Sequence, residues 1–347
     1  MKLAKKIKMP AVDTGHIQGI AVDRDRKYMY ASFTTSFIKM DMEGNVIGSV
    51  TGLCGHLGCI AYNYDDGKVY GSLEYKHDVI GKKILERVSG QKNLDIDVED
   101  GFYIVSFDVD KINRVGMDAE ADGVMTAICL SEVISDFKAE GHRYGCSGID
   151  GVTFAPIPGE KGKKYLYVAY GIYSDLDRND NDCQVILRYD TSEFEKYAAP
   201  LNQKKMHRYG PDKAESKYFV YTGNTTFGVQ NLEYDEENSL MLLAVYCGKK
   251  PEFPNYPLFF VDMSVGAVER DGREYLSLKK IGKEHSPTGI WGSDFPYGST
   301  GVISLGENKF YFSIPSGSEG KWDAEISLYF YDGVGGFFDI RESTESN

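Results

Sequence analysis

Two histidines of this chain stand in nearly identical segments, forty residues apart. His16 lies in residues 15–23 (GHIQGIAVD) and His56 in residues 55–63 (GHLGCIAYN). Two imidazoles near one axis can ligate a metal ion or share proton transfer at neutral pH. Glu74 adds a carboxylate at the end of an apolar segment, where it could act as a general base. We predict that these three residues are the catalytic or metal-ligating groups of a site. The alternative is that each histidine caps a strand and that Glu74 is a solvated charge.

The oxygen-rich stretch 175–182 (DLDRNDND) is a second candidate. Its side-chain oxygens alternate at Asp175, Asp177, Asn179 and Asn181, and hard cations such as Ca²⁺ take several oxygen ligands. The stretch lacks the glycine and the distant glutamate of an EF-hand loop. These four residues are therefore expected to form either a Ca²⁺ site or a turn whose side chains bond their own backbone.

Three kinds of segment recur along the chain and could position these residues. The first has a small-residue start and then apolar alternation, at 16–22, 56–62, 147–154, 227–235 and 299–305. The second is rich in Tyr and Phe, at 28–33, 69–74, 165–170, 240–246 and 310–314. The third is apolar and ends in Asp, at 38–41, 105–108, 187–190, 260–262 and 330–332. Such patterns between turn residues are typical of β-strands. Fainter fourth strands follow at 46–50 and 275–279.

Five copies of a four-stranded antiparallel unit predict an all-β fold, the β-propeller. We expect a single domain over residues 1–347, with residues 2–9 as a strand that closes the ring. The five blades are predicted near residues 12–52, 53–145, 146–222, 223–284 and 296–341. Helical or irregular insertions are expected in the second blade, at 78–88 and 124–137. Six blades are the alternative if the latter segment contains strands instead.

The apolar strand that ends in Asp resembles the strand and turn of YVTN-type, quinoprotein-like and gluconolactonase-like propellers. This resemblance covers the blade periodicity over most of the chain and implies the propeller shape. It implies no catalytic residue, because no segment matches the metal-binding Glu, Asn and Asp motifs of the lactonases. WD, Kelch and Asp-box signatures do not repeat in the sequence either.

In a propeller, the first strand of each blade lines a central channel, and the loops at one end surround its mouth. The substrate-binding residues expected there, beside the three catalytic candidates, are Gln18, Asp150, Asn224, Gln230, Trp291 and Asp294. We predict that this site binds a small polar molecule such as a carbohydrate, or hydrolyses it with the help of a metal ion. An enzyme of this kind would be a hydrolase, and Ca²⁺ is the candidate cofactor. The alternative function is a non-catalytic protein-interaction scaffold.

The composition limits the partners of the protein. Lys and Arg number 39 against 52 Asp and Glu, which gives a net charge of −13 and argues against a nucleic acid or an anionic membrane as partner. No segment approaches the length of a membrane span. Six cysteines do not suggest a disulfide scaffold. We expect a soluble protein, cytoplasmic if the chain is full length and extracytoplasmic if a signal peptide has been removed. The sequence leaves the oligomeric state open.

Overall fold

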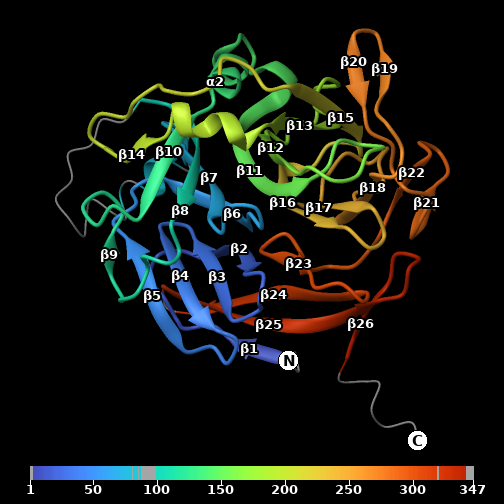
Figure 1. The fold of residues 1–347 in the computed structure, drawn as a ribbon. Coiled ribbons are helices and arrows are strands. Elements are labelled where there is room, and N and C mark those ends of the chain that lie inside the picture. The colour runs from blue at the N-terminus through green and yellow to red at the C-terminus, as the bar shows by residue number, and fades with distance from the viewer. Residues whose placement is uncertain (1–2, 80, 85, 87–98, 319, 341–347) are drawn as a thin grey trace, which may run out of the picture.

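The chain forms a ring of five β-sheets around a central axis, as a computed structural model shows (Figure 1). The structure describes residues 3–79, 81–84, 86, 99–318 and 320–340. The prediction of an all-β, five-bladed propeller is confirmed, and the six-bladed alternative is wrong. The innermost strands are β2 (Ile17–Val22), β6 (His56–Tyr62), β11 (Cys146–Ala155), β16 (Thr226–Asp235) and β23 (Val302–Ser304).

Antiparallel hairpins build each blade outward from its inner strand. Blade 1 continues with β3 (Tyr28–Phe33), β4 (Ser36–Asp41) and β5 (Val46–Thr51), beside which β9 (Met117–Asp118) lies. Blade 2 continues with β7 (Val69–Tyr75), β8 (Gly101–Phe107), β10 (Met125–Cys129) and the short β14 (Ala199–Pro200). Blade 3 continues with β12 (Tyr165–Ile172), β13 (Cys183–Tyr189) and β15 (Ser216–Tyr221). Blade 4 continues with β17 (Leu240–Tyr246) and β18 (Leu258–Asp262), followed by the hairpin of β21 (Lys283–His285) and β22 (Ile290–Gly292).

Blade 5 is completed from both ends of the chain. Its strands β24 (Lys309–Ser318) and β25 (Lys321–Tyr331) form a long hairpin. The free edge of β25 pairs with the N-terminal strand β1 (Lys6–Lys8) and, farther along, with β26 (Phe337–Asp339). An N-terminal strand that pairs with the last blade closes the ring and covers an edge that would otherwise expose unpaired backbone groups.

The predicted insertion at 124–137 contains both a strand and a helix. Residues 125–129 form β10, the fourth strand of blade 2, and α2 (Ser131–Lys138) follows at once. The short helices η1 (Arg143–Gly145) and η2 (Thr191–Lys196) lie farther along the chain. The predicted insertion at 78–88 falls partly outside the described residues.

The fourth strand predicted for blade 4 at 275–279 is present as a short bridge, in which Leu278 pairs antiparallel with Val261 of β18. The N–H of Lys279 donates to the carbonyl oxygen of Phe260, and the carbonyl oxygen of Ser277 accepts the N–H of Asp262. The residues just before this bridge differ from the prediction, since β20 (Arg273–Tyr275) pairs in parallel with β15 of blade 3 and forms a hairpin with β19 (Val268–Arg270). The edge of β15 offers unpaired backbone groups, and the ring of Tyr275 packs 5.7 Å from that of Phe219. These two contacts place β20 on blade 3, although the residues that follow it pair with blade 4.

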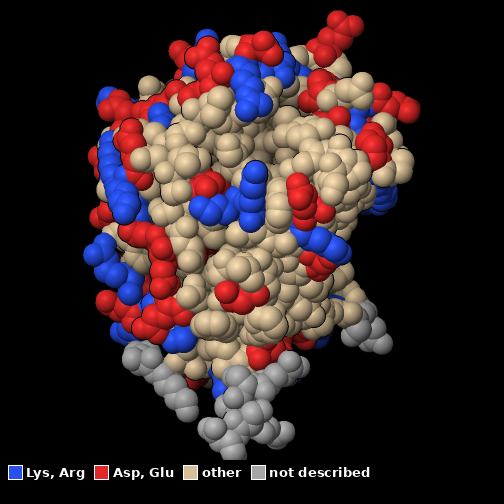
Figure 2. Space-filling model, turned by 90° about the vertical axis from the view of Figure 1, so that its right-hand side faces the viewer, with Lys and Arg blue, Asp and Glu red and all other residues tan. Residues whose placement is uncertain are grey.

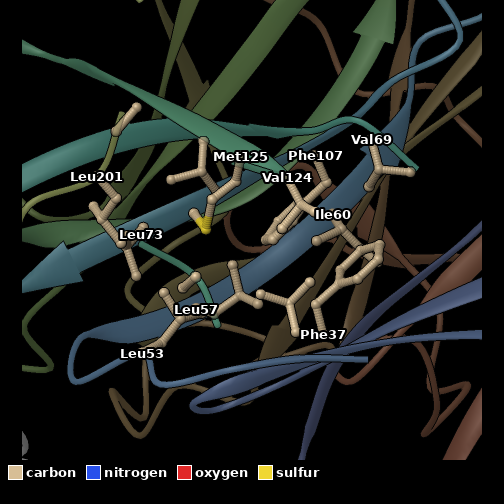
Figure 3. Packing of buried hydrophobic residues seen from close by; sticks show 14 of the residues in the cluster. Phe37, Leu53, Leu57, Ile60, Val69, Leu73, Phe107, Val124, Met125 and Leu201 are labelled. Carbon is tan, nitrogen blue, oxygen red and sulfur yellow. The ribbon is translucent and has the colours of Figure 1, made fainter. Parts of the chain in front are cut away.

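Five clusters of buried apolar side chains fill the contacts between adjacent blades in the described chain. Figure 3 shows the cluster between blades 1 and 2, where Phe37 meets Ile60, Val69 and Phe107. The rings of Phe37 and Phe107 stack with their centroids 4.2 Å apart. The faces of neighbouring sheets therefore bury each other, and this packing holds the inner strands in fixed positions.

The aspartates that end the third strands start the next turns. Oδ1 of four of the five accepts a hydrogen bond from a backbone N–H two residues later; these are Asp41, Asp190, Asp262 and Asp332. This Asx turn reverses the chain toward the outer edge of the blade.

On the face shown in Figure 2, acidic and basic side chains are interspersed, and uncharged residues cover much of the centre. All six cysteines are free thiols, four of them buried. None of the helices that the structure describes has the length and apolar character needed to cross a bilayer.

Candidate functional site

A cavity of about 160 Å³ lies at one mouth of the channel, and we call it the mouth cavity. The starts of the inner strands and the ends of the second strands of blades 1 to 4 form its wall. The residues that line it are His16, Gln18, His56, Glu74, Lys76, Asp78, Ser147, Ile149, Asp150, Gly171, Tyr173, Phe227, Gln230 and Tyr246. The topology therefore brings together polar side chains that are far apart in the sequence.

Irregular strand pairing marks this end of the ring. The register between the first and second strands shifts in β2, β6, β11 and β16, close to the mouth in each case. A β-bulge bends a strand and redirects its side chains, and bulges are frequent next to active sites. Four blades thus use the same irregularity where they meet the cavity.

A buried ion pair forms one wall of the cavity. Lys76 Nζ lies 2.6 Å from Glu74 Oε1, and the two side chains are 7% and 5% exposed. The ammonium also donates to the carbonyl oxygen of Ser147 at 3.0 Å. The second carboxylate oxygen, Glu74 Oε2, accepts the backbone N–H of Ile149 at 3.2 Å. Blades 2 and 3 are therefore joined by charged hydrogen bonds at the bottom of the cavity.

The same carboxylate holds His56. These residues face each other across the β6–β7 pair, and His56 Nδ1 lies 3.3 Å from Glu74 Oε1. Burial alone would raise the pKa of Glu74, but the charge of Lys76 and the contact with His56 keep it below its usual value. Burial would likewise lower the pKa of His56, yet the bond to Glu74 and the charges of Asp150 and Glu74 raise it. Glu74 is therefore a fixed anion that favours the imidazolium form of His56.

Asp150 is a buried carboxyl group of the cavity whose pKa is raised, in contrast to that of Glu74. It comes from β11, is 7% exposed, and its Oδ1 accepts the backbone N–H of Cys59 at 3.3 Å. Burial raises the pKa of Asp150 to about 7, with the charge of Glu74 adding to the shift and that of His56 opposing it. The pKa values of Asp150 and His56 are both raised, and the charge of each group acts on the ionisation of the other, so they form a coupled acid–base pair.

Amide side chains and aromatic rings complete the wall. Gln18 Nε2 lies 3.2 Å from His16 Nε2 and donates to Thr34 Oγ1 at 3.1 Å. The Gln230 amide donates to the carbonyl oxygen of Phe227 at 3.0 Å. Burial raises the pKa of Tyr246 to about 12, so its phenol stays protonated and can donate a hydrogen bond.

Comparison with known proteins assigns this chain to no family and to no function. No protein-family model matches the chain, and no curated protein matches its sequence. Among solved structures, the soluble aldose sugar dehydrogenase of Escherichia coli in its apo form is 11% identical, with a TM-score of 0.41, over 91% of this chain and 98% of that one. The glutaminyl cyclase of Myxococcus xanthus is 8% identical, with a TM-score of 0.39, over 95% and 97%. A functionally unknown protein from Desulfotomaculum acetoxidans is 9% identical, with a TM-score of 0.38, over 96% and 74%. Likeness at this level concerns the fold alone, so the function has to be argued from the site.

The structure brings six of the nine predicted catalytic and substrate-binding residues to the mouth cavity: His16, Gln18, His56, Glu74, Asp150 and Gln230. Three others do not line it. Asn224 is buried, and neither atom of its amide group has a hydrogen-bond partner among the described residues. Trp291 lies on β22, and Asp294 forms an exposed ion pair with Lys283.

The predictions also missed several lining residues, of which Ser147, Phe227 and Tyr246 are the clearest. Ser147 and Phe227 stand at the small-residue starts of inner strands, and Tyr246 ends a second strand. Applying the positions of His16 and Glu74 to every repeat would have pointed to them.

A lysine ammonium lies among the oxygens of the predicted Ca²⁺ stretch. Asp175 Oδ1 accepts the N–H of Asp177 at 3.0 Å, which is an Asx turn. The Asn181 amide donates to the carbonyl oxygen of Asp175 at 2.9 Å, and its Oδ1 accepts from the buried Lys250 Nζ at 3.0 Å. Among the described residues there is no group of three His, Cys, Asp or Glu side chains that could hold a metal ion. A Ca²⁺ ion in this loop would compete with Lys250 for the same oxygens.

Proposed function

We propose that the mouth cavity is an acid–base active site that hydrolyses a small polar molecule. One observation carries the proposal: Asp150 lines the same small cavity as His56, and burial raises its pKa to about 7. A catalytic acid or base works best when its pKa lies near the working pH. Perturbed carboxyl groups in a cavity are typical of functional sites.

The pair can divide the two proton transfers of a hydrolysis. In the state with an ionised Asp150 and a protonated His56, the carboxylate takes a proton from the attacking water. The imidazolium then gives a proton to the leaving atom, so that the protons balance. Glu74 and Lys76 supply fixed charges that hold His56 in place. Gln18 and Gln230 present amide groups that can orient the substrate.

The size of the cavity limits the substrate. At about 160 Å³ it is smaller than the roughly 300 Å³ at which typical ligand pockets begin, so the substrate, or the part of it that enters, is a single small unit. A scaffold that only binds a protein would need neither this hollow nor shifted ionisable groups. The hydrolytic role is therefore favoured over the scaffold role.

A substrate screen tests the proposal. Nitrophenyl esters of small acids, nitrophenyl phosphates and nitrophenyl glycosides would be incubated with the wild type and with Asp150→Asn between pH 5 and 9. We expect the wild type to turn over one class of substrate with a bell-shaped pH profile. In Asp150→Asn this turnover should be at least a hundredfold lower. Turnover that is equal in both proteins would contradict the role of Asp150.

A further inference from the structure

Phe227 is held at the cavity in an unfavourable backbone conformation. Its φ of 66° lies in the left-handed region, which bulky L-residues rarely adopt. Its side chain is 42% exposed, although phenylalanine usually avoids water. It belongs to none of the buried clusters found in the described chain. Core packing therefore does not account for this ring, whereas its place in the lining of the mouth cavity does.

The surrounding backbone enforces this placement. The ladder between β16 and β17 shifts register between Thr226 and Val229, so Phe227 and Gly228 form the bulge. Gly228 is also left-handed, with φ of 76°, and a β-carbon there would stand 2.4 Å from the carbonyl oxygen of Tyr170. The Gln230 amide also donates a hydrogen bond to the carbonyl oxygen of Phe227. Strain that its surroundings enforce in this way is often found where a site needs a pre-positioned group.

The lining of the cavity combines aromatic rings with charged and amide groups. Phe227 and the neighbouring Tyr246 of β17 contribute rings. The carboxyl groups of Glu74 and Asp150 lie among the polar lining residues, together with the amide of Gln230. A ligand that suits this mixed lining has an apolar face and a polar periphery of hydroxyl groups.

We propose that the mouth cavity takes one sugar ring, with the C–H face of the ring against Phe227. Sugar hydroxyls donate to carboxylates and accept from amides, which matches Asp150 and Gln230. An aromatic face packs well against the C–H groups of a pyranose and excludes water from them. This inference rests on the proposed function, since it names the substrate class of the same cavity.

Calorimetric titration of the full chain with free monosaccharides tests the inference without any turnover. The probes are D-glucose, D-galactose, D-mannose, D-xylose and N-acetyl-D-glucosamine, each at pH 7. We expect at least one to bind the wild type and Phe227→Gly to weaken it tenfold or more. Phe227→Tyr should keep the affinity within threefold, because the ring is kept.

The melting temperature separates this effect from a folding defect. Phe227→Gly removes the left-handed strain, so its melting temperature should equal or exceed that of the wild type. Ser239→Gly is the matched control, because Ser239 has a φ of 50° and does not line the cavity, so its sugar affinity should not change.

Three results would overturn the inference: no sugar binds, Phe227→Gly binds as well as the wild type, or a planar aromatic such as adenine binds in place of the sugars. Failure of the proposed hydrolysis looks different, since sugars would then bind in a Phe227-dependent way while no glycoside is turned over.

Discussion

Gly58 and Asp150 belong to neighbouring blades, and a β-carbon on Gly58 would stand 2.2 Å from Asp150 Oδ1. The corresponding position in the first copy of the repeat is Gln18, whose side chain lines the mouth cavity. The second copy has no side chain at this position, and the carboxyl group of Asp150 occupies the space beside Gly58. A difference between two nearly identical segments thus makes room for the central residue of the proposed site.

Replacing Gly58 with alanine should therefore disturb both stability and activity. The added methyl group also falls 2.5 Å from Ser72 Oγ, so side chains have to shift. We expect a loss of about 1–3 kcal/mol in the free energy of unfolding, measured with urea, and at least a tenfold loss of turnover. Gly266→Ala is the control, because its β-carbon would meet nothing closer than 3.8 Å. Equal stability of the two variants would refute this explanation of Gly58.

Asp150→Asn should lower the activity. The stability of this variant relative to the wild type should increase as the pH rises. The raised pKa of Asp150 means that, between about pH 4 and 7, the folded state holds a proton that the unfolded state releases. The stability of the wild type therefore falls with pH across this window. The raised pKa of His56, which depends partly on the charge of Asp150, acts in the same direction.

Urea unfolding of both proteins at pH 4, 6 and 8 measures this effect. The difference in unfolding free energy, variant minus wild type, should grow by roughly 3 kcal/mol between the extremes. Burying an amide with incomplete hydrogen bonding costs the same at every pH, so this cost cancels when unfolding free energies at different pH values are compared. A difference that stays flat with pH would mean that Asp150 ionises normally.

Glu233, at the other end of β16, allows an independent test of how a raised carboxyl pKa affects stability. It lines a separate cavity of about 500 Å³, and burial raises its pKa to about 8. Its Oε1 accepts the N–H of Ser304 at 2.8 Å, and Lys164 and Asp235 line the same cavity. Glu233→Gln should thus gain stability over the wild type as the pH rises from about 4.5 to 8, while turnover at the mouth cavity stays within twofold. A tenfold loss of turnover would show that the two ends of the channel are linked.

Lys76→Met should strongly destabilise the protein. It leaves the buried carboxylate of Glu74 without its cation, and breaking a buried pair by removing one partner costs about 3–5 kcal/mol. Lys283→Met is the matched control, since its pair with Asp294 is exposed and adds little to stability. Chemical denaturation compares the two. A loss in Lys76→Met no larger than that in the control would contradict the assigned burial.

Calcium should raise the melting temperature of Lys250→Met more than that of the wild type. In the wild type the Lys250 ammonium contacts Arg178 O, Asn181 Oδ1 and Asp182 Oδ1. The variant leaves these oxygens to another cation. Melting in millimolar calcium and in chelator should therefore give a shift for Lys250→Met that exceeds the wild-type shift by several degrees. Equal shifts would show that Lys250 does not exclude the ion.

The repeating segments were sufficient to predict the propeller, because inner strands, turn aspartates and Tyr-rich second strands each follow a local pattern. The assignment of β20 to blade 3 could not be predicted, since its pattern suits an edge strand of either blade. Its partner is chosen by the edge of β15 and by Phe219, which are distant in the sequence.

The part of the site that depends on position in the repeat could be predicted from the sequence. His56 and Glu74 face the cavity because their places in the repeat lie at the mouth. The altered ionisation of Asp150 depends on burial against Gly58 and on charges from blade 2, and none of these is visible in its own segment. The repeat position of His16 points to Phe227 in the fourth blade, and the bulge between Thr226 and Val229 lets both Phe227 and Gln230 line the cavity.

The most direct test of the proposed site is a carbon-13 NMR titration of the side-chain carboxyl groups, with Asp150→Asn used to assign the Asp150 signal. We predict that this signal titrates near pH 7 and that its curve is coupled to that of the His56 imidazole. An Asp150 signal that titrates near pH 4, independently of His56, would contradict the acid–base pair on which the proposed function depends.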